Sequence, residues 1–394
     1  MMPDLDDGDV RIWLGDVLDG LRAMPNGLAQ TCVTSPPYWG LRDYGADGQI
    51  GLEDSPDEFV ARLVDVFREV RRVLRDDGTV WLNLGDSYAS ALACDRRNVV
   101  GAGSLENGKR DARPNRLVGG LKEKDLVGIP WRVAFALQAD GWYLRSDIIW
   151  AKPNPMPESV TDRPTKSHEY VFLLSKSARY FYDSDAIREP DSGAPAGNRT
   201  RRIADGSDGK RPADHLGASV PWENVGGGRN ARSVWPITTR PYAGAHFATF
   251  PPELPERCIS AGTSDAGACS ACGSPLERVV IATAPDGREA VMRGGKTRDV
   301  DGRPLMGDNM IDHGTRGSFA SAGGATLARR TGGWQATCSC DAGVVPQVVL
   351  DPFMGSGTTA WVARNLGRHA VGCELNPEYL AIARERLRQL SLLA

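Results

Sequence analysis

The stretch Val348–Ala360, VVLDPFMGSGTTA, joins a β-branched apolar run to a helix-forming segment through a loop with two glycines. Gly355, Gly357 and Ala360 have the G-x-G-x-x-A spacing of strand–loop–helix turns that bind adenosine-containing ligands. Glycines let the backbone approach a ligand, and the helix N-terminus carries partial positive charge. No lysine follows the glycines, so the loop is not a P-loop. The stretch predicts an α/β fold with a nucleotide-type site, a tight turn without a ligand being the alternative.

Two acidic residues near this loop narrow the choice of ligand. Glu374 ends the next apolar run, near the position about 20 residues downstream where an acid would bind ribose hydroxyls. Asp351 directly precedes the loop, where it would repel a pyrophosphate but attract an amine. S-adenosylmethionine carries such an amine, its methionyl ammonium, beside a sulfonium. We therefore expect S-adenosylmethionine rather than NAD.

Apolar runs alternate with helical patterns along much of the chain. The clearest helix begins at Pro56, with Ser55 as its N-cap and Glu58 completing a capping box. Strand-like runs are expected near residues 9–16, 29–38, 79–86, 143–152, 168–175, 346–353 and 369–375. This alternation predicts a doubly wound, mostly parallel sheet with helices on both faces.

Composition is that of an ordinary globular protein. The chain has 394 residues, 41% of them hydrophobic, and a net charge of −3, so an anionic partner would need a local basic patch. No apolar run approaches the ~20 residues that span a bilayer, so we expect no membrane partner. The acidic N-terminus does not resemble a signal peptide. We therefore expect a cytoplasmic protein whose eight cysteines are thiols or metal ligands rather than disulfides.

A second motif follows the run that ends near Thr34. Ser35, Pro36, Pro37 and Tyr38 come where the prolines must end the strand. The Ser35 hydroxyl and the Pro36 carbonyl could accept the two N–H groups of an exocyclic amine and release its lone pair for methylation. Tyr38 could stack on a base swung out of a helix. Cys32, just before the motif, is interpreted as a packed core residue rather than a nucleophile.

The two motifs together resemble the S-adenosylmethionine-dependent amino-methyltransferases of DNA. That family carries an S/D/N-P-P-Y/F/W catalytic motif and a D-P-F-x-G-S-G-T cofactor motif. The catalytic motif comes first here, as in the circularly permuted β-group. The resemblance covers about 240 residues, in 10–185, 242–263 and 346–390, and implies a Rossmann-like methyltransferase domain with a seven-stranded type of sheet.

The resemblance also assigns roles to residues. It implies that Ser35, Pro36, Pro37 and Tyr38 are catalytic. It places the cofactor against Asp16, Phe250, Asp351, Phe353, Gly355, Gly357, Thr358 and Glu374. Ser rather than Asp before Pro-Pro-Tyr resembles members that methylate cytosine N4 in double-stranded DNA, and adenine N6 is the alternative. One alternative is a non-catalytic DNA-binding protein with a degenerate site, which would leave both intact motifs unexplained. Another is an NAD-dependent oxidoreductase, which would leave the Pro-Pro motif unexplained. A cognate restriction endonuclease and a homodimer are partners that the resemblance leaves open.

The family order divides the chain into parts. Residues 1–185 would form the catalytic half, with a mobile basic loop at 90–124, and residues 242–263 and 346–394 the cofactor half. Residues 186–241 would be the target-recognition region. Arg199, Arg201, Arg202, Arg229 and Arg232 lie there and are the expected DNA contacts, because arginine suits phosphates and guanine edges.

The remaining part, residues 264–345, is a Gly-rich insertion where the family usually has a short link. Cys269 and Cys272 lie near its start, and Cys338 and Cys340 near its end. Four thiolates suit a structural zinc ion. The spacing therefore predicts a zinc site that closes the base of the insertion, four free thiols being the alternative.

Overall fold

The computed structural model describes residues 2–41, 48–89, 120–190, 229–240, 250–283, 289–293, 296–298 and 328–391. The chain forms two compact units. The first comprises Met1–Ala186, Arg232–Pro275 and Cys338–Ala394, and the second comprises Ile187–Ala231 and Leu276–Thr337. Most of the expected basic loop at 90–124 lies outside the described residues.

The first unit is built on a sheet that has nine strands in the described part of the chain. Its order is β1 (Leu5–Asp6), β2 (Val10–Leu14), β15 (His369–Glu374), β14 (Val348–Asp351), β3 (Ala29–Thr34), β4 (Leu74–Leu84), β6 (His168–Ser175), β5 (Tyr143–Ala151) and β7 (Val234–Pro236). Strands β2, β15, β14, β3 and β4 are parallel. Strand β6 runs antiparallel to both β4 and β5. The predicted mostly parallel α/β sheet is thus confirmed, and the short strands β1 and β7 extend its two edges.

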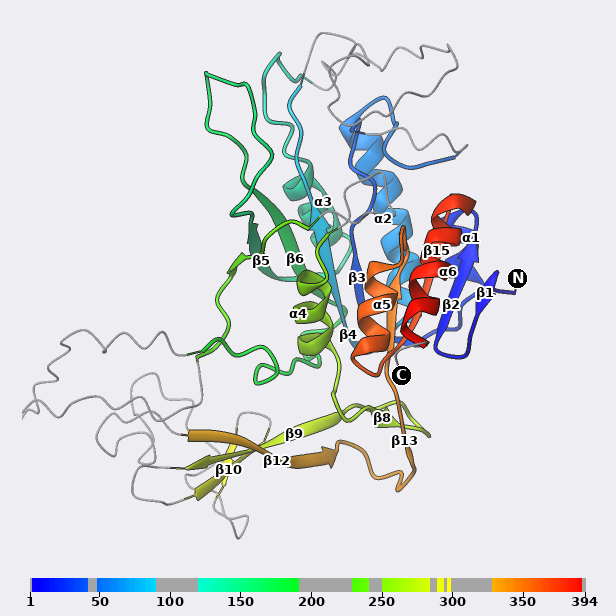
Figure 1. Ribbon diagram of the computed structural model, residues 1–394, viewed down its shortest axis with the longest axis vertical. Coiled ribbons are helices and arrows are strands. Elements are labelled where there is room, and N and C mark those ends of the chain that lie inside the picture. Colours follow the sequence, from blue (N-terminus) through cyan, green and yellow to red (C-terminus); the bar gives the residue numbers. More distant parts are fainter. Residues whose placement is uncertain are drawn as a thin grey trace, which may run out of the picture. The chain divides into compact units, whose positions relative to one another are not determined.

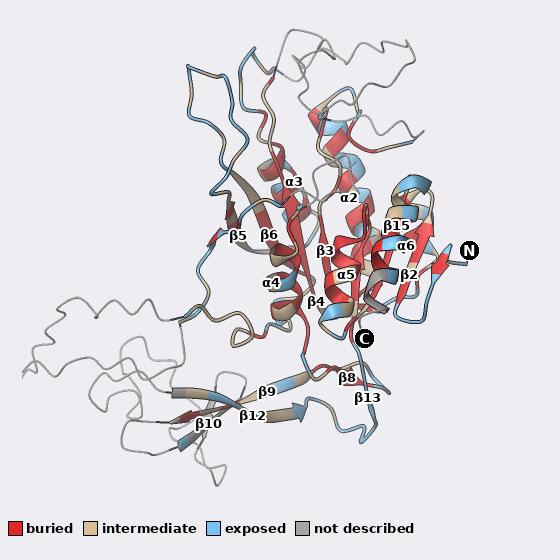
Figure 2. Ribbon diagram, in the orientation of Figure 1, coloured by how far each residue is buried: buried red, intermediate tan, exposed pale blue. Residues whose placement is uncertain are grey.

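Helices cover both faces of this sheet (Figure 1). Helices α1 (Val17–Arg22), α2 (Pro56–Val73) and α3 (Ile129–Ala139) contact β15, β4 and β5, respectively. Helices α4 (Glu253–Gly262), α5 (Thr358–Asn365) and α6 (Pro377–Ser391) lie in front of the strands in that view and contact β3, β14 and β2. The doubly wound arrangement follows from strands that are apolar on both faces. Figure 2 shows this as a sheet that is buried along most of its strands.

Helix α2 begins as its sequence predicts. The Ser55 hydroxyl accepts a hydrogen bond from the Glu58 amide, and Pro56 occupies the first turn. Phe59 and Phe67 on its inner face are fully buried. The helix ends at Val73, and β4 starts at once at Leu74. The strand therefore includes Asp76–Gly78, which lie before the strand-like run expected at 79–86.

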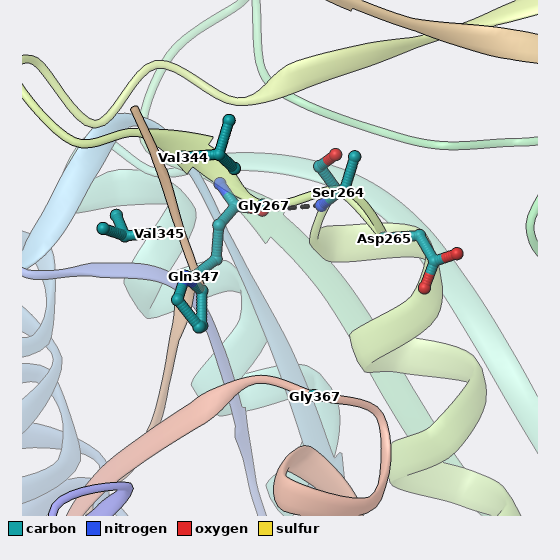
Figure 3. Close-up of a pocket in the computed structure, with 9 residues that line it drawn as sticks. Ser264, Asp265, Gly267, Val344, Val345, Gln347 and Gly367 are labelled. Atoms are coloured by element: carbon teal, nitrogen blue, oxygen red, sulfur yellow. Dashed lines mark hydrogen bonds between the residues drawn. The ribbon is translucent and has the colours of Figure 1, made fainter. Parts of the chain in front are cut away.

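The carboxamide of Gln347, directly before β14, fixes the point where the chain returns to the sheet (Figure 3). Its Oε1 accepts from the Ser264 amide at 2.6 Å, and its Nε2 donates to Gln30 Oε1 in β3 at 2.9 Å. The backbone carbonyl of Gln347 accepts a hydrogen bond from the His369 amide of β15. The small pocket in Figure 3 lies beside this residue, at the amino end of β14. One buried side chain thus connects the end of α4 to the middle of the sheet.

Beside Gln347, strands β8 (Ala268–Cys269) and β13 (Val344–Val345) form a short antiparallel pair. The Gly267 backbone lies close to β13, since a Cβ at this glycine would lie 2.5 Å from the Val345 carbonyl oxygen. Both ends of the expected insertion therefore belong to the first unit.

The second unit contains an antiparallel sheet in the order β11 (Lys296–Arg298), β10 (Glu289–Arg293), β9 (Leu276–Thr283) and β12 (Ala328–Ala336). Strand β12 pairs with β9 from Ala336↔Leu276 to Ala328↔Thr283, with an irregularity between Thr331 and Gly333. No strands are expected in this insertion from the sequence. Their signal is the apolar run Val279–Ile281 in β9, which is only three residues long and lies in a long insertion with many glycines.

Candidate active site

Three carboxylates lie at one edge of the sheet because three neighbouring parallel strands end there. Asp351 ends β14, Glu374 ends β15, and Asp16 is the second residue after β2. Register keeps these ends level, since Glu374 pairs with Leu14 and Asp351 with Gly372. The carboxyl end of a parallel sheet is where ligands bind in open α/β folds. The structure thus brings together three of the acids assigned to the cofactor.

Asp351 is buried, with only 2% of its surface exposed. Its Oδ1 accepts from the Thr34 hydroxyl at 2.7 Å and from the Phe353 amide at 3.0 Å. Burial raises the pKa of Asp351 to about 6, against the opposing effect of these neutral donors and of the Thr359 hydroxyl. A carboxylate held among uncharged donors would gain from a cationic ligand group, so this site suits a ligand with an ammonium.

Glu374 is oriented by backbone amides. Its Oε2 accepts from Gly355 at 2.6 Å and its Oε1 from Asn376 at 2.8 Å. Burial raises the pKa of Glu374 above its usual range. The glycine loop is therefore fastened to the end of β15, next to the position expected for a ribose.

Two glycines are required by the geometry here. Gly357 caps α5 with φ of +77°, a left-handed conformation that disfavours other residues. Gly372 faces β14 so closely that a Cβ would lie 2.2 Å from the Asp351 carbonyl oxygen. The loop and its strand consequently fit only without side chains at these positions.

The sequence also assigned Asp16, Thr358 and Phe250 to the cofactor. The Asp16 carboxylate caps α1 by accepting from the Leu18 amide. Burial raises the pKa of Cys373, and the charges of Asp351, Asp16 and Glu374 raise it further. The Thr358 hydroxyl is 2.8 Å from Arg386 Nη1. Phe250 lies three residues before α4, a helix that contacts α5 and β3.

The Ser-Pro-Pro-Tyr motif lies beside Asp351. Strand β3 pairs with β14, and the bond between Thr34 and Asp351 joins the last residue of β3 to the end of β14. Ser35 follows directly, and its hydroxyl is 3.4 Å from the Tyr38 hydroxyl. Cys32 is fully buried, as predicted, and burial raises its pKa well above the usual value. The two halves of the expected site thus meet although 317 residues separate Thr34 from Asp351.

Glu169 in β6 is a site residue that sequence reasoning missed. Its Oε2 accepts from the Tyr38 hydroxyl at 2.7 Å and from Asn83 Nδ2 at 3.1 Å. Its Oε1 pairs with the Lys152 ammonium. No local sequence pattern marks this residue, because the antiparallel pairing of β6 with β4 is what brings Glu169 next to the end of β4. This network holds the Tyr38 hydroxyl in place.

Gly85, directly after β4, makes room for the Tyr38 ring. A Cβ at Gly85 would lie 2.6 Å from Tyr38 Cε2. The adjacent Trp39 is buried, and its indole donates to the Glu53 carbonyl at 2.9 Å. The aromatic pair after the prolines is thus anchored on both sides.

Of the five arginines expected to contact DNA, Arg199, Arg201 and Arg202 lie outside the described residues. Arg229 is in the second unit, where its Nε is 2.9 Å from Glu189 Oε2. Arg232 belongs to the first unit, and its carbonyl accepts from the Trp235 indole. The Glu189 carboxylate would compete with a DNA phosphate for the Arg229 guanidinium.

The four cysteines of the insertion lie together in the first unit. The sulfur atoms of Cys269, Cys272, Cys338 and Cys340 are all within 4.8 Å of one another. All four are free thiols in the structure. The geometry therefore agrees with the grouping expected from their spacing.

Sequence comparison decides the family. A sequence model described as DNA methylase (N6_N4_Mtase) matches residues 29–269 and 344–385, which include the Ser-Pro-Pro-Tyr motif, Asp351 and Glu374. The chain belongs to this DNA methylase family. As a member of it, the chain is an S-adenosylmethionine-dependent DNA methyltransferase, which confirms the prediction at that level.

Individual relatives agree with this assignment. The Type II methyltransferase M.XycI of Xanthomonas campestris pv. cyanopsidis is 42% identical over 378 residues, covering 95% of this chain and 86% of the relative. M.Cfr9I of Citrobacter freundii is 40% identical with the same coverage. Among solved structures, the cytosine-N4-specific PvuII DNA methyltransferase matches with a TM-score of 0.51 at 16% identity, over 98% of this chain and 88% of that one. This last likeness supports the methyltransferase fold.

Proposed function

We propose that this DNA methylase transfers the methyl group of S-adenosylmethionine to the exocyclic N4 amine of cytosine in double-stranded DNA. The observation that carries the proposal is the bond between Thr34 and Asp351, which sets the Ser35–Tyr38 loop beside the acid suited to the methionyl ammonium. Serine at position 35 favours cytosine N4 over adenine N6, by the resemblance of SPPY-type members.

In the proposed reaction, the cofactor's sulfonium supplies an electrophilic methyl group. Ser35 Oγ and the Pro36 carbonyl accept the amine N–H groups, so that the nitrogen lone pair can form the new N–C bond as the S–C bond breaks. Tyr38, held by Glu169, stacks on the flipped base. The methylated nitrogen then loses one proton to solvent water and becomes a neutral amine, and the cofactor is left as S-adenosylhomocysteine.

The arrangement of the strands supports the permuted β-group order. Strands β14 and β15 come from the end of the chain but lie between β2 and β3, which come from its start. Asp351 and Glu374 thus follow the catalytic motif in the sequence, although their strands lie between β2 and β3 in the sheet. The full-length relatives named as Type II methyltransferases support a role beside a cognate restriction endonuclease.

The base assignment is tested on DNA from cells that express the protein. Nucleoside mass spectrometry separates N4-methylcytosine from N6-methyladenine, and sequencing of modified positions gives their context. We expect N4-methylcytosine in one sequence context, absent with Ser35→Ala and present with Ser339→Ala, an exposed serine outside the site. N6-methyladenine instead would overturn the base assignment while leaving the family intact.

A further inference from the structure

The family does not account for three of the four clustered cysteines. The matched segments stop at residue 269 and resume at residue 344, so Cys272, Cys338 and Cys340 lie in the unmatched interval. The interval begins after β8 and ends before β13, the two strands of the short antiparallel pair. Something other than the methyltransferase core must therefore explain why four thiols meet at this point.

The geometry points to a structural zinc ion bound by Cys269, Cys272, Cys338 and Cys340, and we propose that this site closes the base of the insertion. In a regular zinc–thiolate tetrahedron with bonds of about 2.3 Å, the sulfur atoms lie about 3.8 Å apart. The four sulfur atoms here all fall within 4.8 Å of one another, which leaves space for one ion at their centre. Two disulfides would need pairs of sulfur atoms at about 2.05 Å, whereas all four thiols are free.

The first cysteine pair lies on a tight turn that the backbone itself fixes. The Gly273 amide donates to the Cys269 carbonyl at 2.8 Å, and the Cys269 amide donates to Ser274 at 2.9 Å. Gly273 has φ of +71°, which glycine adopts without strain. Arg75 Nη1 donates to the Cys272 carbonyl at 3.0 Å and so attaches the turn to β4. The two sulfur atoms are thus presented side by side by a preformed turn.

The second cysteine pair, Cys338 and Cys340, lies on the returning chain, which pairs with the outgoing chain across β8 and β13. Cys269 pairs with Val344 across β8 and β13, and the Ser270 amide donates to the Gly343 carbonyl at 2.8 Å. Only three residues separate Cys340 from Val344. The outgoing and returning chains are therefore already aligned where the ion would join them.

The chemistry of the donors favours zinc in a structural role. Zinc has no geometric preference of its own and takes four thiolates tetrahedrally, and four sulfur ligands leave no position for water. The site also lies away from the reaction, because the chain from Cys340 enters β14 at its amino end and Asp351 lies at the other end. Zinc binding would stabilise the fold without taking part in methyl transfer.

The first test is the metal content of the full-length protein purified without added metal. We expect about one zinc per chain, and a mercurial titration that releases this zinc as four thiols react. Less than about a tenth of an equivalent of zinc would overturn the proposal, as would iron in its place. Two disulfides, seen as a loss of four alkylatable thiols in the non-reduced protein, would also overturn it.

Variants test the ligands individually. Cys272→Ser and Cys340→Ser should each bind at least tenfold less zinc, whereas Ser339→Ala, which changes the residue between two ligands, should keep the full equivalent. If the cysteine variants do not fold, cobalt replaces zinc in the wild-type protein, and the visible spectrum of a tetrahedral tetrathiolate is expected. An octahedral cobalt spectrum would overturn the assignment. A chelator should lower the Tm of the wild-type protein and leave its affinity for S-adenosylhomocysteine unchanged at a temperature where it remains folded.

Discussion

Replacing Asp351 with asparagine should make the protein without cofactor more stable while weakening cofactor binding. Burial raises the pKa of Asp351 from 3.8 to about 6. A raised carboxyl pKa means that the folded protein disfavours the ionised form of Asp351. Above the folded pKa, this lowers the free energy of unfolding by about 3 kcal/mol, since each of the roughly two pKa units corresponds to about 1.4 kcal/mol. Asparagine avoids that cost, and its oxygen still accepts from Thr34 and Phe353.

The sign of the effect depends on pH. Below about pH 4, Asp351 is protonated in both states and the wild type has no penalty. As pH rises through about 6, the wild type loses stability that Asp351→Asn keeps. Chemical denaturation at pH 4, 6 and 8 measures this difference. Glu385→Gln, which removes an exposed acid from α6, is the matched control and should show little change.

Binding should change in the opposite direction. Loss of the charge-assisted bond to the methionyl ammonium typically costs ~1.5–3 kcal/mol, so Asp351→Asn should bind S-adenosylhomocysteine roughly 10- to 100-fold more weakly by titration calorimetry. Wild-type affinity should also fall about tenfold between pH 7 and pH 5, because one pH unit below its pKa only about a tenth of Asp351 is ionised. Two results would refute the reasoning. One is a stability of Asp351→Asn, measured relative to the wild type, that is lower at pH 8 than at pH 4. The other is an affinity for S-adenosylhomocysteine equal to that of the wild type.

Three further predictions concern turnover and DNA. Ser35→Ala should abolish or sharply lower methyl transfer from tritiated cofactor while affinity for S-adenosylhomocysteine persists; full activity would remove Ser35 from the mechanism. Gly85→Ala should push the Tyr38 ring aside and lower kcat on the order of 100-fold, as for a ~1 Å misplacement. Glu169→Gln should lower kcat with a smaller effect on the KM for DNA. An unchanged kcat in either variant would contradict the proposed positioning of Tyr38. DNA affinity should fall steeply with rising salt in a filter-binding assay because phosphate contacts release counterions, and a flat dependence would speak against the arginine-rich recognition region.

The parts of the site that the sequence predicted are those in which chemistry is local. The glycine loop with Asp351, the acid Glu374 and the Ser-Pro-Pro-Tyr run each carry their meaning within a few residues, so they could be recognised without the fold. The cysteine pairs were likewise visible, because topology required the insertion to return to its starting point.

What the sequence could not give depends on pairing between distant strands. Glu169 gains its role only because β6 runs antiparallel beside β4, and the bond between Thr34 and Asp351 requires β14 to enter between β15 and β3. The pairing of β9 with β12 was missed because the apolar run of β9, Val279–Ile281, is short and its partner strand lies about 50 residues away in the sequence. Such contacts are set by register, which no local pattern determines.

The Gln347 carboxamide, which joins Ser264 to Gln30, bears on how the protein could be divided. A polypeptide that ended within the insertion would keep Ser35 and lose the two strands at the centre of the sheet, whereas the remaining piece would carry Asp351 and Glu374. Neither piece would hold a complete site. Each piece would, however, have a strand edge that can hydrogen-bond to a strand of the other piece, and the contacts of Gln347 with Ser264 and Gln30 would join the two pieces. The enzyme could therefore be produced as two complementing fragments, and DNA methylation would report that the fragments had assembled.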